Sequence, residues 1–414
     1  MFPVKNPNLC PVCNSQVWRH KSSCPILKRI LLQYDLKSKI TANDIFGATP
    51  PSIMVGEHAY PKVNVGILLT PERGDASIHD APKIWYQLKM SIEDVFKLRL
   101  NLVNARKHFN VDLATKPDRY LDAMQQIAAS SLSLDTEVKL TKKPLISLHF
   151  DPSSAPYGPV GTLEKVEITD NPKIDRRVDY IISDTDYKAE TAMLDLYKHG
   201  YDVYNISKIL SVGLLGVKIQ RKLVPTKWSI TAADSTIIKF LLHEVKENQQ
   251  ISEYQLYEAN YMGNYFEILF IPTPWMFEVV EIAVPGAAWM QGRKAPIITS
   301  DHEFHWGRKT YAENVAGGYY AAELAVLEHL SSIKKQAGVL IVREIRPEYY
   351  APIGVWKVRE CVRDAMSKKP LVFNNLSEAL KRIDSLFITK SDFWKRESKI
   401  LEYIKNQKSL KQFF

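Results

Sequence analysis

Cysteine is scarce in this sequence, and long apolar runs are missing. Four cysteines in 414 residues argue against a disulfide framework and indicate a reducing, intracellular setting. No stretch of about 18 uninterrupted apolar residues occurs, so we expect no membrane span. Residues 1–10 are basic but lack a following apolar segment, which argues against a secretory signal. We therefore expect a cytoplasmic protein that has no membrane partner.

The sequence also lacks internal repeats and low-complexity segments, and its composition is typical of a globular protein. Hydrophobic residues make up 45% and charged residues 24%. The formal net charge of +9 lies at the ends, because residues 1–45 carry +5, residues 395–414 carry +4, and residues 46–394 are neutral overall. Basic ends suit contacts with phosphate or acidic partners, although solvated surface lysines would give the same pattern. We expect a core domain at 46–394 between two small basic segments.

Residues 10–24 contain three of the four cysteines, in the order Cys-x2-Cys-x6-His-x3-Cys. Two close cysteines and a second pair of ligands can complete a tetrahedron around Zn²⁺, and so short a segment needs such a metal to fold. Four protein ligands leave no open coordination position, so we expect a structural zinc knuckle that can also contact DNA. Free thiols beside a surface histidine are the alternative. The expected ligands are Cys10, Cys13, His20 and Cys24.

Apolar periodicity predicts both helices and strands. A capping signature, Ser91 with Asp94, begins one helix. Further helices are expected at 118–129, 184–199, 231–246, 311–336, 355–366 and 391–405. Strands are expected at 143–150, at 251–260, 264–271, 275–283 and 339–342, and as a pair within 163–182 around a turn at 170–172. The expected fold class is mixed α/β (α+β), with a partly antiparallel sheet covered by long helices and a small N-terminal zinc knuckle.

Two polar stretches are predicted to lie on irregular backbone. The first, residues 50–86, carries Glu57 and His58, and the second carries Asp301 and Glu303. Loops with such groups are often functional, so Glu57, Asp301 or Glu303 is the expected base of a hydrolytic reaction. An ordinary polar connection is the alternative for the first stretch. The histidines of the second stretch lack metalloprotease spacing, so the sequence only suggests a metal there.

Cationic and aromatic side chains form a second set of candidates. Lys227 lies beside Trp228, and this combination suits phosphate binding with base stacking. Tyr320 follows a glycine pair that indicates close approach by a ligand or by another helix. Arg343 and Arg359 can bind phosphate bidentately, or each can pair with the glutamate that follows it. Together with His58, these residues are the expected nucleotide- and phosphate-binding groups.

The last eight residues read Gln-x-x-Leu-x-x-Phe-Phe. One helical turn would place the leucine and both phenylalanines on one face, as an apolar plug for a partner's groove. The pattern resembles the interaction box by which proteins bind the sliding clamp PCNA, while a frayed helix end is the alternative. The expected clamp-binding residues are Gln407, Leu410, Phe413 and Phe414.

Several long stretches together resemble the archaeal Nre family of DNA repair proteins over essentially the whole chain. They are the N-terminal knuckle, the loop PPSIMVGEHAYPKVNVG, and LVPTKWSITAAD, AGGYYAAELAVLEHL, VREI, GVWKVRECVRDAM and the terminal clamp box. His20 departs from the family, whose members commonly carry a fourth cysteine there. The resemblance implies an archaeal, nucleoid-associated protein that works on damaged DNA with the sliding clamp.

Two function classes follow from these patterns. The first is a clamp-recruited enzyme that processes damaged or modified DNA ends or nucleotides, by phosphodiester or ADP-ribosyl hydrolysis. The second is a non-catalytic adaptor that links damaged DNA to PCNA. An adaptor should tolerate alanine at Glu57, Asp301, Glu303 and Arg343, whereas an enzyme should fail when a decisive one is replaced. A third class, a clamp regulator without a DNA role, would show no salt-dependent DNA affinity.

Overall fold

The structure is a computed structural model that describes residues 16, 19, 43–144, 158–287, 290 and 293–406. The chain divides into two compact units, Met1–Ile237 and Ile238–Phe414. The boundary falls within the long helix α8, Thr226–Lys246. Among the described helices, none combines the length and apolar character that a membrane span requires.

The first unit is built on a mixed six-stranded sheet in the order β1-β5-β6-β4-β3-β2. Strands β4 and β6 are parallel and the other neighbouring strands are antiparallel. The strands are β1 Asp44–Thr49, β2 Ile53–Val55, β3 Lys62–Leu69, β4 Val103–Asn110, β5 Leu134–Leu140 and β6 Val160–Ile168. In β5 buried and less buried residues alternate, as the two-residue period of a half-buried strand requires.

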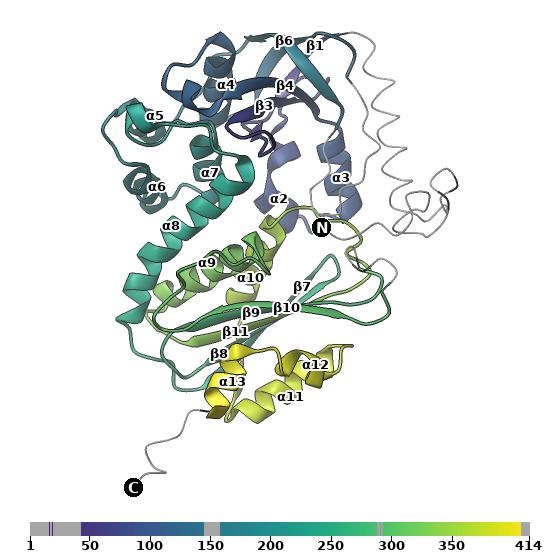
Figure 1. Ribbon diagram of the computed structural model, residues 1–414, viewed down its shortest axis with the longest axis vertical. Coiled ribbons are helices and arrows are strands. Elements are labelled where there is room, and N and C mark those ends of the chain that lie inside the picture. The colour runs from purple at the N-terminus through teal and green to yellow at the C-terminus, as the bar shows by residue number, and fades with distance from the viewer. Residues whose placement is uncertain are drawn as a thin grey trace. The chain divides into compact units, whose positions relative to one another are not determined.

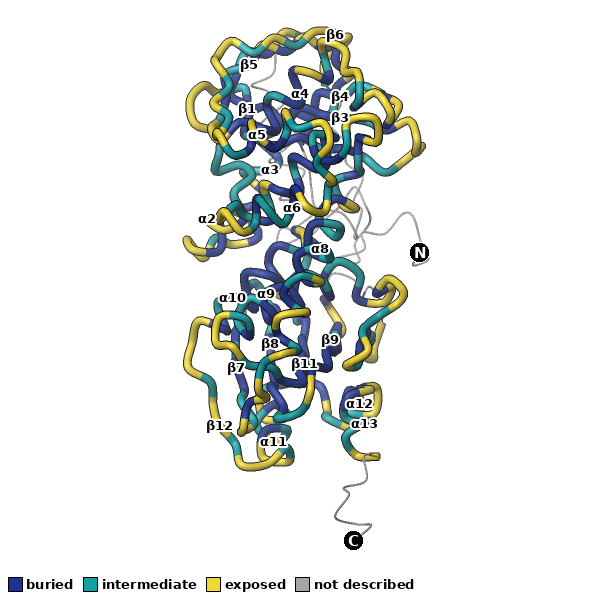
Figure 2. The backbone as a smooth tube through the Cα atoms, turned by 90° about the vertical axis from the view of Figure 1, so that its left-hand side faces the viewer, coloured by how far each residue is buried: buried dark blue, intermediate teal, exposed yellow. Residues whose placement is uncertain are grey.

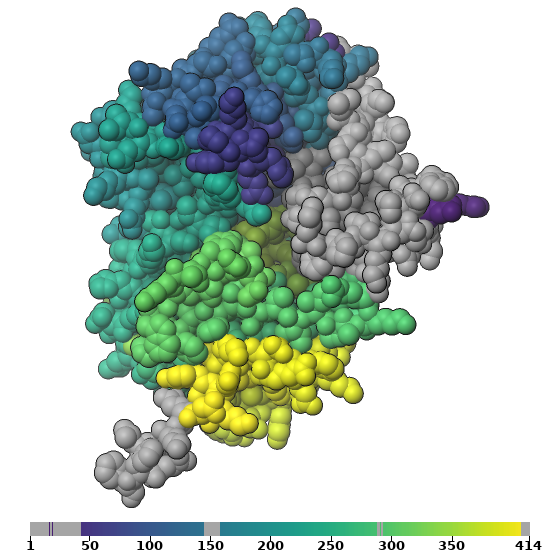
Figure 3. Space-filling model, in the orientation of Figure 1, coloured from purple at the N-terminus to yellow at the C-terminus, as the bar shows by residue number. Residues whose placement is uncertain are grey.

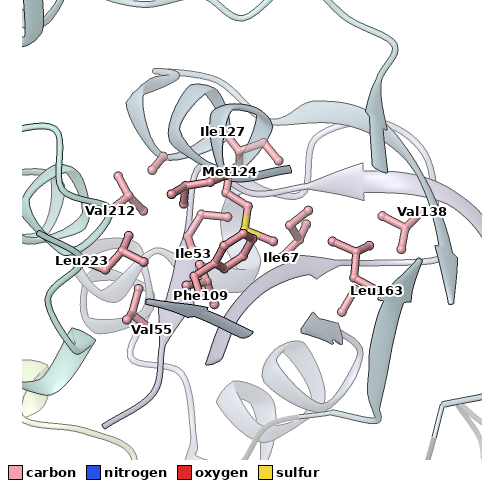
Figure 4. Packing of buried hydrophobic residues seen from close by; sticks show 14 of the residues in the cluster. Ile53, Val55, Ile67, Phe109, Met124, Ile127, Val138, Leu163, Val212 and Leu223 are labelled. Atoms are coloured by element: carbon pink, nitrogen blue, oxygen red, sulfur yellow. The ribbon is translucent and has the colours of Figure 1, made fainter. Parts of the chain in front are cut away.

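The core of the first unit lies where helix α4, Arg119–Ala129, covers this sheet. Met124 and Ile127 of α4 pack with Ile67 of β3 and Phe109 of β4, as Figure 4 shows. The remaining helical segments are η1 Ser77–Asp80, α2 Pro82–Gln87, α3 Ile92–Leu100, η2 Val111–Thr115, α5 Arg176–Ser183, α6 Ala189–Lys198, α7 Val203–Ser211 and η3 Lys218–Gln220.

The second unit contains another six-stranded sheet, in the order β10-β9-β11-β8-β7-β12. Strands β9 and β11 are parallel, and all other neighbouring strands are antiparallel. The strands are β7 Tyr254–Tyr261, β8 Asn264–Ile271, β9 Met276–Ala283, β10 Ile297–Glu303, β11 Gly338–Ile345 and β12 Leu371–Phe373. Every residue of β11 is buried, which Figure 2 shows as a dark blue strand, because helices cover both faces of this sheet.

Helices α9, Gly317–Ser332, and α10, Trp356–Met366, lie on one face of the second sheet (Figure 1). On the other face lie α11 Leu376–Leu386, α12 Ser391–Lys395 and α13 Lys399–Asn406. Ile383 of α11, Trp394 of α12 and Ile400 of α13 join one apolar cluster with the sheet residues Leu340 and Val342. The second unit is therefore a three-layer α/β/α arrangement.

The fold class predicted from the sequence is confirmed, since both sheets mix parallel and antiparallel pairs and carry helices. The Ser91 capping box is present, with Asp94 N donating to Ser91 Oγ at 3.1 Å and Ser91 N donating to Asp94 Oδ2 at 3.1 Å. The helix at 118–129 is confirmed with Asp118 as its N-cap, and the helix at 355–366 is confirmed as α10. The three strands expected between 251 and 283 correspond to β7, β8 and β9, although β11 separates β8 from β9.

Several predicted elements differ from the structure. The second strand expected before residue 182 is helix α5, because Asp175 caps it and Val178 and Ile181 share its buried face. Helix α8 begins at Thr226 rather than 231, with the Pro225 carbonyl accepting from the backbone of its first turn. The segment 391–405 forms two helices instead of one. Most of the strand expected at 143–150 lies outside the described residues.

Helix α9 begins at Gly317, later than the predicted start at residue 311. The backbone N–H groups of Asn314 and Val315 are bound by the carboxylate of Asp301, so they are not available for helical hydrogen bonds. The glycine pair therefore lies at the first two positions of the helix instead of inside it. This places the loop 304–316 directly between strand β10 and helix α9.

Candidate functional site

Asp301 of β10 holds the loop 304–316 in place. Its Oδ2 atom accepts from the backbone N–H groups of Asn314 at 2.9 Å and Val315 at 2.8 Å. Its Oδ1 atom accepts from Arg308 Nη2 at 3.2 Å. A carboxylate engaged by this many donors is well suited to fixing a loop.

Arg308 holds the same loop from within. Its guanidinium donates to the backbone carbonyls of His302 at 2.7 Å, Tyr311 at 3.0 Å and Thr310 at 3.2 Å. Tyr320 of α9 adds a further contact, because its hydroxyl accepts from Ala312 N at 3.0 Å. The loop is thus held between Arg308 and Val315 by side-chain bonds rather than by a regular ladder.

This loop, the end of β10 and the start of α13 surround a cavity of about 520 Å³. Lys309 is exposed and Lys399 half-exposed, so both cations lie at the rim, and the Trp306 side chain is 63% exposed. In Figure 3 the green residues of this part of the chain lie beside the yellow C-terminal helices. The cavity is lined by Ser300, Asp301, His302, Glu303, Phe304, Trp306, Gly307, Arg308, Lys309, Thr310, Asn314 and Lys399.

Glu303 contributes a buried carboxyl group to this cavity. Its side chain has the same orientation as that of Asp301, since alternate residues of a strand face the same side, and only 6% of the residue is exposed. Its Oε1 atom accepts from Trp275 Nε1 at 2.6 Å. Burial raises the pKa of Glu303, and the Trp275 hydrogen bond opposes that rise only in part.

Glu323 of α9 lies within hydrogen-bond reach of the Glu303 carboxyl group. Burial and then the charge of Glu303 raise the pKa of Glu323 well above its ordinary value. Tyr319 precedes Glu323 by one helical turn, and its ring lies 5.2 Å from the Arg308 guanidinium carbon. Among the described residues, the Tyr319 hydroxyl and Glu323 Oε1 are buried with no hydrogen-bond partner. The lining of the cavity therefore continues inward as a buried acidic cluster.

His302 lies between Asp301 and Glu303 on strand β10, so its side chain faces the opposite side of the strand. Burial, and then the charges of Arg308 and Lys399, lower the pKa of His302. Its ring centroid lies 5.2 Å from that of Phe304. We therefore expect a neutral imidazole at neutral pH, with an aromatic neighbour.

The predicted phosphate-binding arginines are buried. Arg343 Nε donates to Asn264 Oδ1 at 3.0 Å, and its Nη1 pairs with Glu281. Lys357 Nζ donates to the same Asn264 oxygen at 3.2 Å. These contacts favour the ion-pair alternative for Arg343. Arg359 is fully buried on α10.

The ion pairs differ from those expected between neighbouring residues. Arg343 pairs with Glu281 of β9, while Glu344 accepts from Arg346 Nε at 2.8 Å. Glu360 accepts from Arg363 at 2.9 Å, three residues along the same helix. Consecutive residues on a strand face opposite sides, and consecutive residues on a helix do not face each other, so adjacent partners were geometrically unsuitable.

The other predicted residues gather in the first unit. Lys227 Nζ lies 3.5 Å from Glu57 Oε1, and the side chain of Lys227 is 75% exposed. The rings of Tyr60 and Trp228 are 5.3 Å apart, although 168 residues separate them in the sequence. The structure thus brings Glu57 and Lys227 together at an exposed aromatic pair, whereas Asp301, Glu303, Tyr320 and Arg343 belong to the second unit.

The predicted zinc ligands Cys10, Cys13, His20 and Cys24 lie outside the described residues, and so do the clamp-binding residues Gln407, Leu410, Phe413 and Phe414. Within the described part of the chain, no group of three or more acidic, histidine or cysteine side chains is arranged to hold a metal ion. The zinc and clamp sites remain predictions from the sequence.

Sequence reasoning missed Glu323, Tyr319 and Trp275. One signal was available, because Glu323 interrupts the apolar run AAELAVL within a helix that is buried along most of its length. A lone carboxylate in such a run needs a partner or a proton. The sequence does not show that the partner of Glu323 is Glu303, because this contact depends on the packing of α9 against the sheet.

Comparison with known proteins identifies the family. The family profile described as "Archaeal Nre, N-terminal" matches residues 19–290, and "Archaeal Nre, C-terminal" matches residues 303–413. DNA repair protein NreA of Archaeoglobus fulgidus is 36% identical over 371 residues, which cover 90% of this chain and 92% of the relative. DNA repair protein NreB of the same organism is 34% identical over 375 residues, covering 91% and 92%.

DNA repair protein NreA of Haloferax volcanii is 34% identical over 349 residues, covering 83% of each chain. No solved structure matches this chain significantly. Both halves of the sequence match one family, and each of these relatives matches over most of its own length. The chain therefore belongs to the archaeal Nre family, as its sequence resemblance implied.

Proposed function

We propose that this protein acts in DNA repair and is recruited to DNA by the sliding clamp PCNA. Three relatives at 34–36% identity carry the name DNA repair protein. The C-terminal sequence Gln-x-x-Leu-x-x-Phe-Phe supports clamp docking, because its three apolar anchors would share one face of a helical turn. The basic segments at both ends support contact with the DNA backbone.

The protein processes damaged or modified DNA ends or nucleotides by hydrolysis, with the cavity beside β10 as its active site. The observation that carries this proposal is the buried carboxyl group of Glu303 in the wall of a polar cavity of about 520 Å³. Buried carboxyl groups with a raised pKa in a cavity are typical of acid–base catalysts. Lys309 and Lys399 at the rim would bind phosphate, and Trp306 would stack on a base.

The first unit would hold the DNA. The exposed pair Tyr60–Trp228 offers ring faces for unpaired bases, and Lys227 beside it offers a cation for phosphate. The four soft ligands at residues 10–24 would hold a structural Zn²⁺ next to basic residues. We expect about one zinc per chain by metal analysis, and its loss in a Cys10→Ser/Cys13→Ser variant.

A matched pair of variants tests the enzyme proposal. Glu303→Gln removes the buried carboxyl group, and Glu313→Gln changes an exposed glutamate on the same loop. Both are incubated with oligonucleotides that carry blocked 5′ or 3′ ends or an ADP-ribosyl adduct, and products are resolved by gel and mass spectrometry. Loss of acid–base catalysis typically costs about 100-fold or more, so we expect that loss for Glu303→Gln alone.

Unfolding midpoints, DNA affinity and clamp affinity are measured for the same variants. Full turnover in a folded Glu303→Gln protein would contradict the active-site assignment. If the wild type converts no substrate but binds DNA and the clamp, the non-catalytic adaptor replaces the enzyme. DNA affinity that does not fall with rising salt would favour a clamp regulator.

A further inference from the structure

The carboxyl group of Glu303, at the end of β10, faces the carboxyl group of Glu323, in the second turn of α9. Neither carboxyl group forms an ion pair within the described part of the chain, and the donors to Glu303 there are Trp275 Nε1, at 2.6 Å, and the carboxyl group of Glu323. The charged or titratable groups that face the pair are Lys246 of α8, Arg308 of the loop, and Tyr319 and Tyr320 of α9. Arg308 is committed to Asp301 and to loop carbonyls, and Lys246 Nζ to the His305 carbonyl at 2.7 Å. Both cations lower the pKa of the pair through their charge, but burial outweighs them and leaves the pKa of both carboxyl groups raised.

Two buried carboxylates in contact cannot both be ionised at neutral pH, because like charges repel strongly where water is excluded. Glu323 is 2% exposed and Glu303 is 6% exposed, so solvent screens neither group effectively. Glu323 Oε1 is buried without a hydrogen-bond partner among the described residues, so no donor there compensates a charge on that oxygen. The pair is expected to hold one shared proton and to titrate as a unit.

We propose that Glu303 passes this shared proton to the leaving group of a glycosidic bond at C1′ of a phosphorylated nucleoside, and that Glu323 is the positioning residue that supplies the proton to Glu303. The inference rests on the proposed function of the same cavity and specifies its substrate class. Glu303 lines the cavity and would touch the reacting atoms, whereas Glu323 acts through Glu303.

The distribution of charge favours a glycosidic bond over a phosphodiester bond. Phosphoryl transfer requires cations around the reacting phosphorus, and the innermost cation of this cavity, Arg308, is occupied by its own loop. The buried end of the cavity offers a proton donor and negative charge, which suit a departing base or alkoxide and the positive charge that develops on the sugar. Lys309 at the rim is exposed and can take a phosphate, and Lys399 can do so on leaving its ion pair with Glu402.

The proton balance of the step is simple. The C1′ bond breaks with its electron pair on the leaving group, which takes the Glu303 proton and departs neutral. Water adds to C1′ and loses a proton, which returns to the carboxylate pair and restores its starting state. The two carboxyl groups touch, so no sugar fits between them, and they serve as one acid rather than as an acid and a separate nucleophile.

The proton itself can be measured without any substrate. Infrared spectra of the full-length protein are recorded across a pH titration for the wild type, Glu303→Gln, Glu323→Gln and the exposed control Glu313→Gln. The wild-type minus variant difference is expected to show one protonated carboxyl group at neutral pH. In Glu323→Gln the remaining carboxyl group is expected to ionise at lower pH. The control is expected to match the wild type, and signals from other buried carboxyl groups cancel in the difference.

Kinetics supply the second measurement. Rates are measured on oligonucleotides with an N-glycosidic lesion or an ADP-ribosyl adduct, and on a phosphodiester substrate of the same length. In Glu323→Gln the alkaline limb of the pH–rate profile should move to lower pH, because the remaining carboxyl group no longer has a charged neighbour. A merely structural role for Glu323 would lower the rate without moving that limb. We expect kcat to fall about 100-fold in Glu303→Gln, with KM changing little.

The outcomes separate this inference from the proposed function. Two ionised carboxylates at neutral pH, or an unmoved alkaline limb in Glu323→Gln, would overturn the shared proton and leave the cavity as an active site. Cleavage of the phosphodiester substrate alone would overturn the substrate class. A shared proton in a protein that turns over none of the substrates would instead count against the proposed function.

Discussion

At the residue scale, the clearest buried interaction is a carboxylate that begins the last described helix. Glu278 of β9 is fully buried, and it accepts from Ser398 Oγ at 2.6 Å, Lys399 N at 2.8 Å and Ile400 N at 2.9 Å. The two backbone donors belong to the first turn of α13, whose N–H groups have no partner within the helix. A strand residue far away in the sequence thus caps the helix that precedes the C-terminal tail.

Replacing Glu278 by alanine should therefore destabilise the second unit. The change leaves buried N–H groups without an acceptor, which costs about 1–3 kcal/mol of unfolding free energy. Urea denaturation followed by circular dichroism measures the change. The exposed Glu397→Ala near the same helix serves as the control and should stay within about 0.5 kcal/mol of the wild type. Equal losses of unfolding free energy in the two variants would show that the Glu278 cap does not stabilise the second unit.

Glu267, on strand β8, is a second buried carboxyl group. It does not line the candidate active site. Its Oε2 atom is buried without a partner among the described residues, and burial followed by the charge of Glu258 raises the pKa of Glu267 to about 9. The folded pKa thus lies above the unfolded value of 4.5. Stability contributed by the proton is present below the unfolded pKa and is lost as pH rises toward 9.

Glu267→Gln should therefore stabilise the protein progressively as pH rises. The glutamine resembles the protonated acid but cannot ionise, so the variant-minus-wild-type difference should grow above pH 4.5 and level off near pH 9. Its slope is at most about 1.4 kcal/mol per pH unit for one proton. Denaturation curves at several pH values measure it, with the exposed Glu253→Gln as control. A pH-independent difference would contradict the assignment.

At the element scale, strand β1 depends on a glycine where the backbone after β3 comes close. A Cβ atom added at Gly47 would lie 1.8 Å from the carbonyl oxygen of Thr70. The two segments are joined there by backbone hydrogen bonds, Thr70 N to Ala48 O and Ala48 N to Glu72 O, both at 2.8 Å. Only a residue without a side chain permits this approach.

Gly47→Ala should destabilise the first unit by about 1–3 kcal/mol, because the backbone must shift to relieve the overlap. Gly56→Ala is a matched control, since a Cβ atom there would lie 3.7 Å from Asn64 O, which is an ordinary contact. Thermal unfolding of both variants gives the comparison. A loss of stability in Gly56→Ala as large as that in Gly47→Ala would rule out the close approach as the cause.

Elements with local signals could be predicted from the sequence. Ser91 and Asp94 defined the start of α3, and Asp118 defined the start of α4, because capping involves residues only a few positions apart. Helix α5 was mistaken for a strand because its β-branched residues resemble one. Helix α9 began late because Asp301, on another element, binds the backbone of the preceding loop.

At the scale of the whole molecule, the C-terminal tail should work independently of the core. Helix α13 ends at Asn406, and the three apolar anchors lie beyond it. Replacing Leu410, Phe413 and Phe414 by alanine should abolish clamp binding, measured by calorimetry, and leave the unfolding midpoint unchanged. Ser409→Ala changes the residue directly before the first anchor and should retain full affinity. Unchanged clamp affinity in the triple variant would contradict the docking role of the tail.

The sequence by itself determined the family, the α/β class, the charged ends, and Glu303 as a candidate base. These depend on composition, periodicity and short motifs, which are written along the chain. Only the tertiary structure decided that Glu303 faces Glu323, that Asp301 and Arg308 fix a loop, and that Arg343 pairs with Glu281. Those partners come from different strands and helices. The free energy of a buried charge depends on what the fold places beside it, not on its neighbours in sequence.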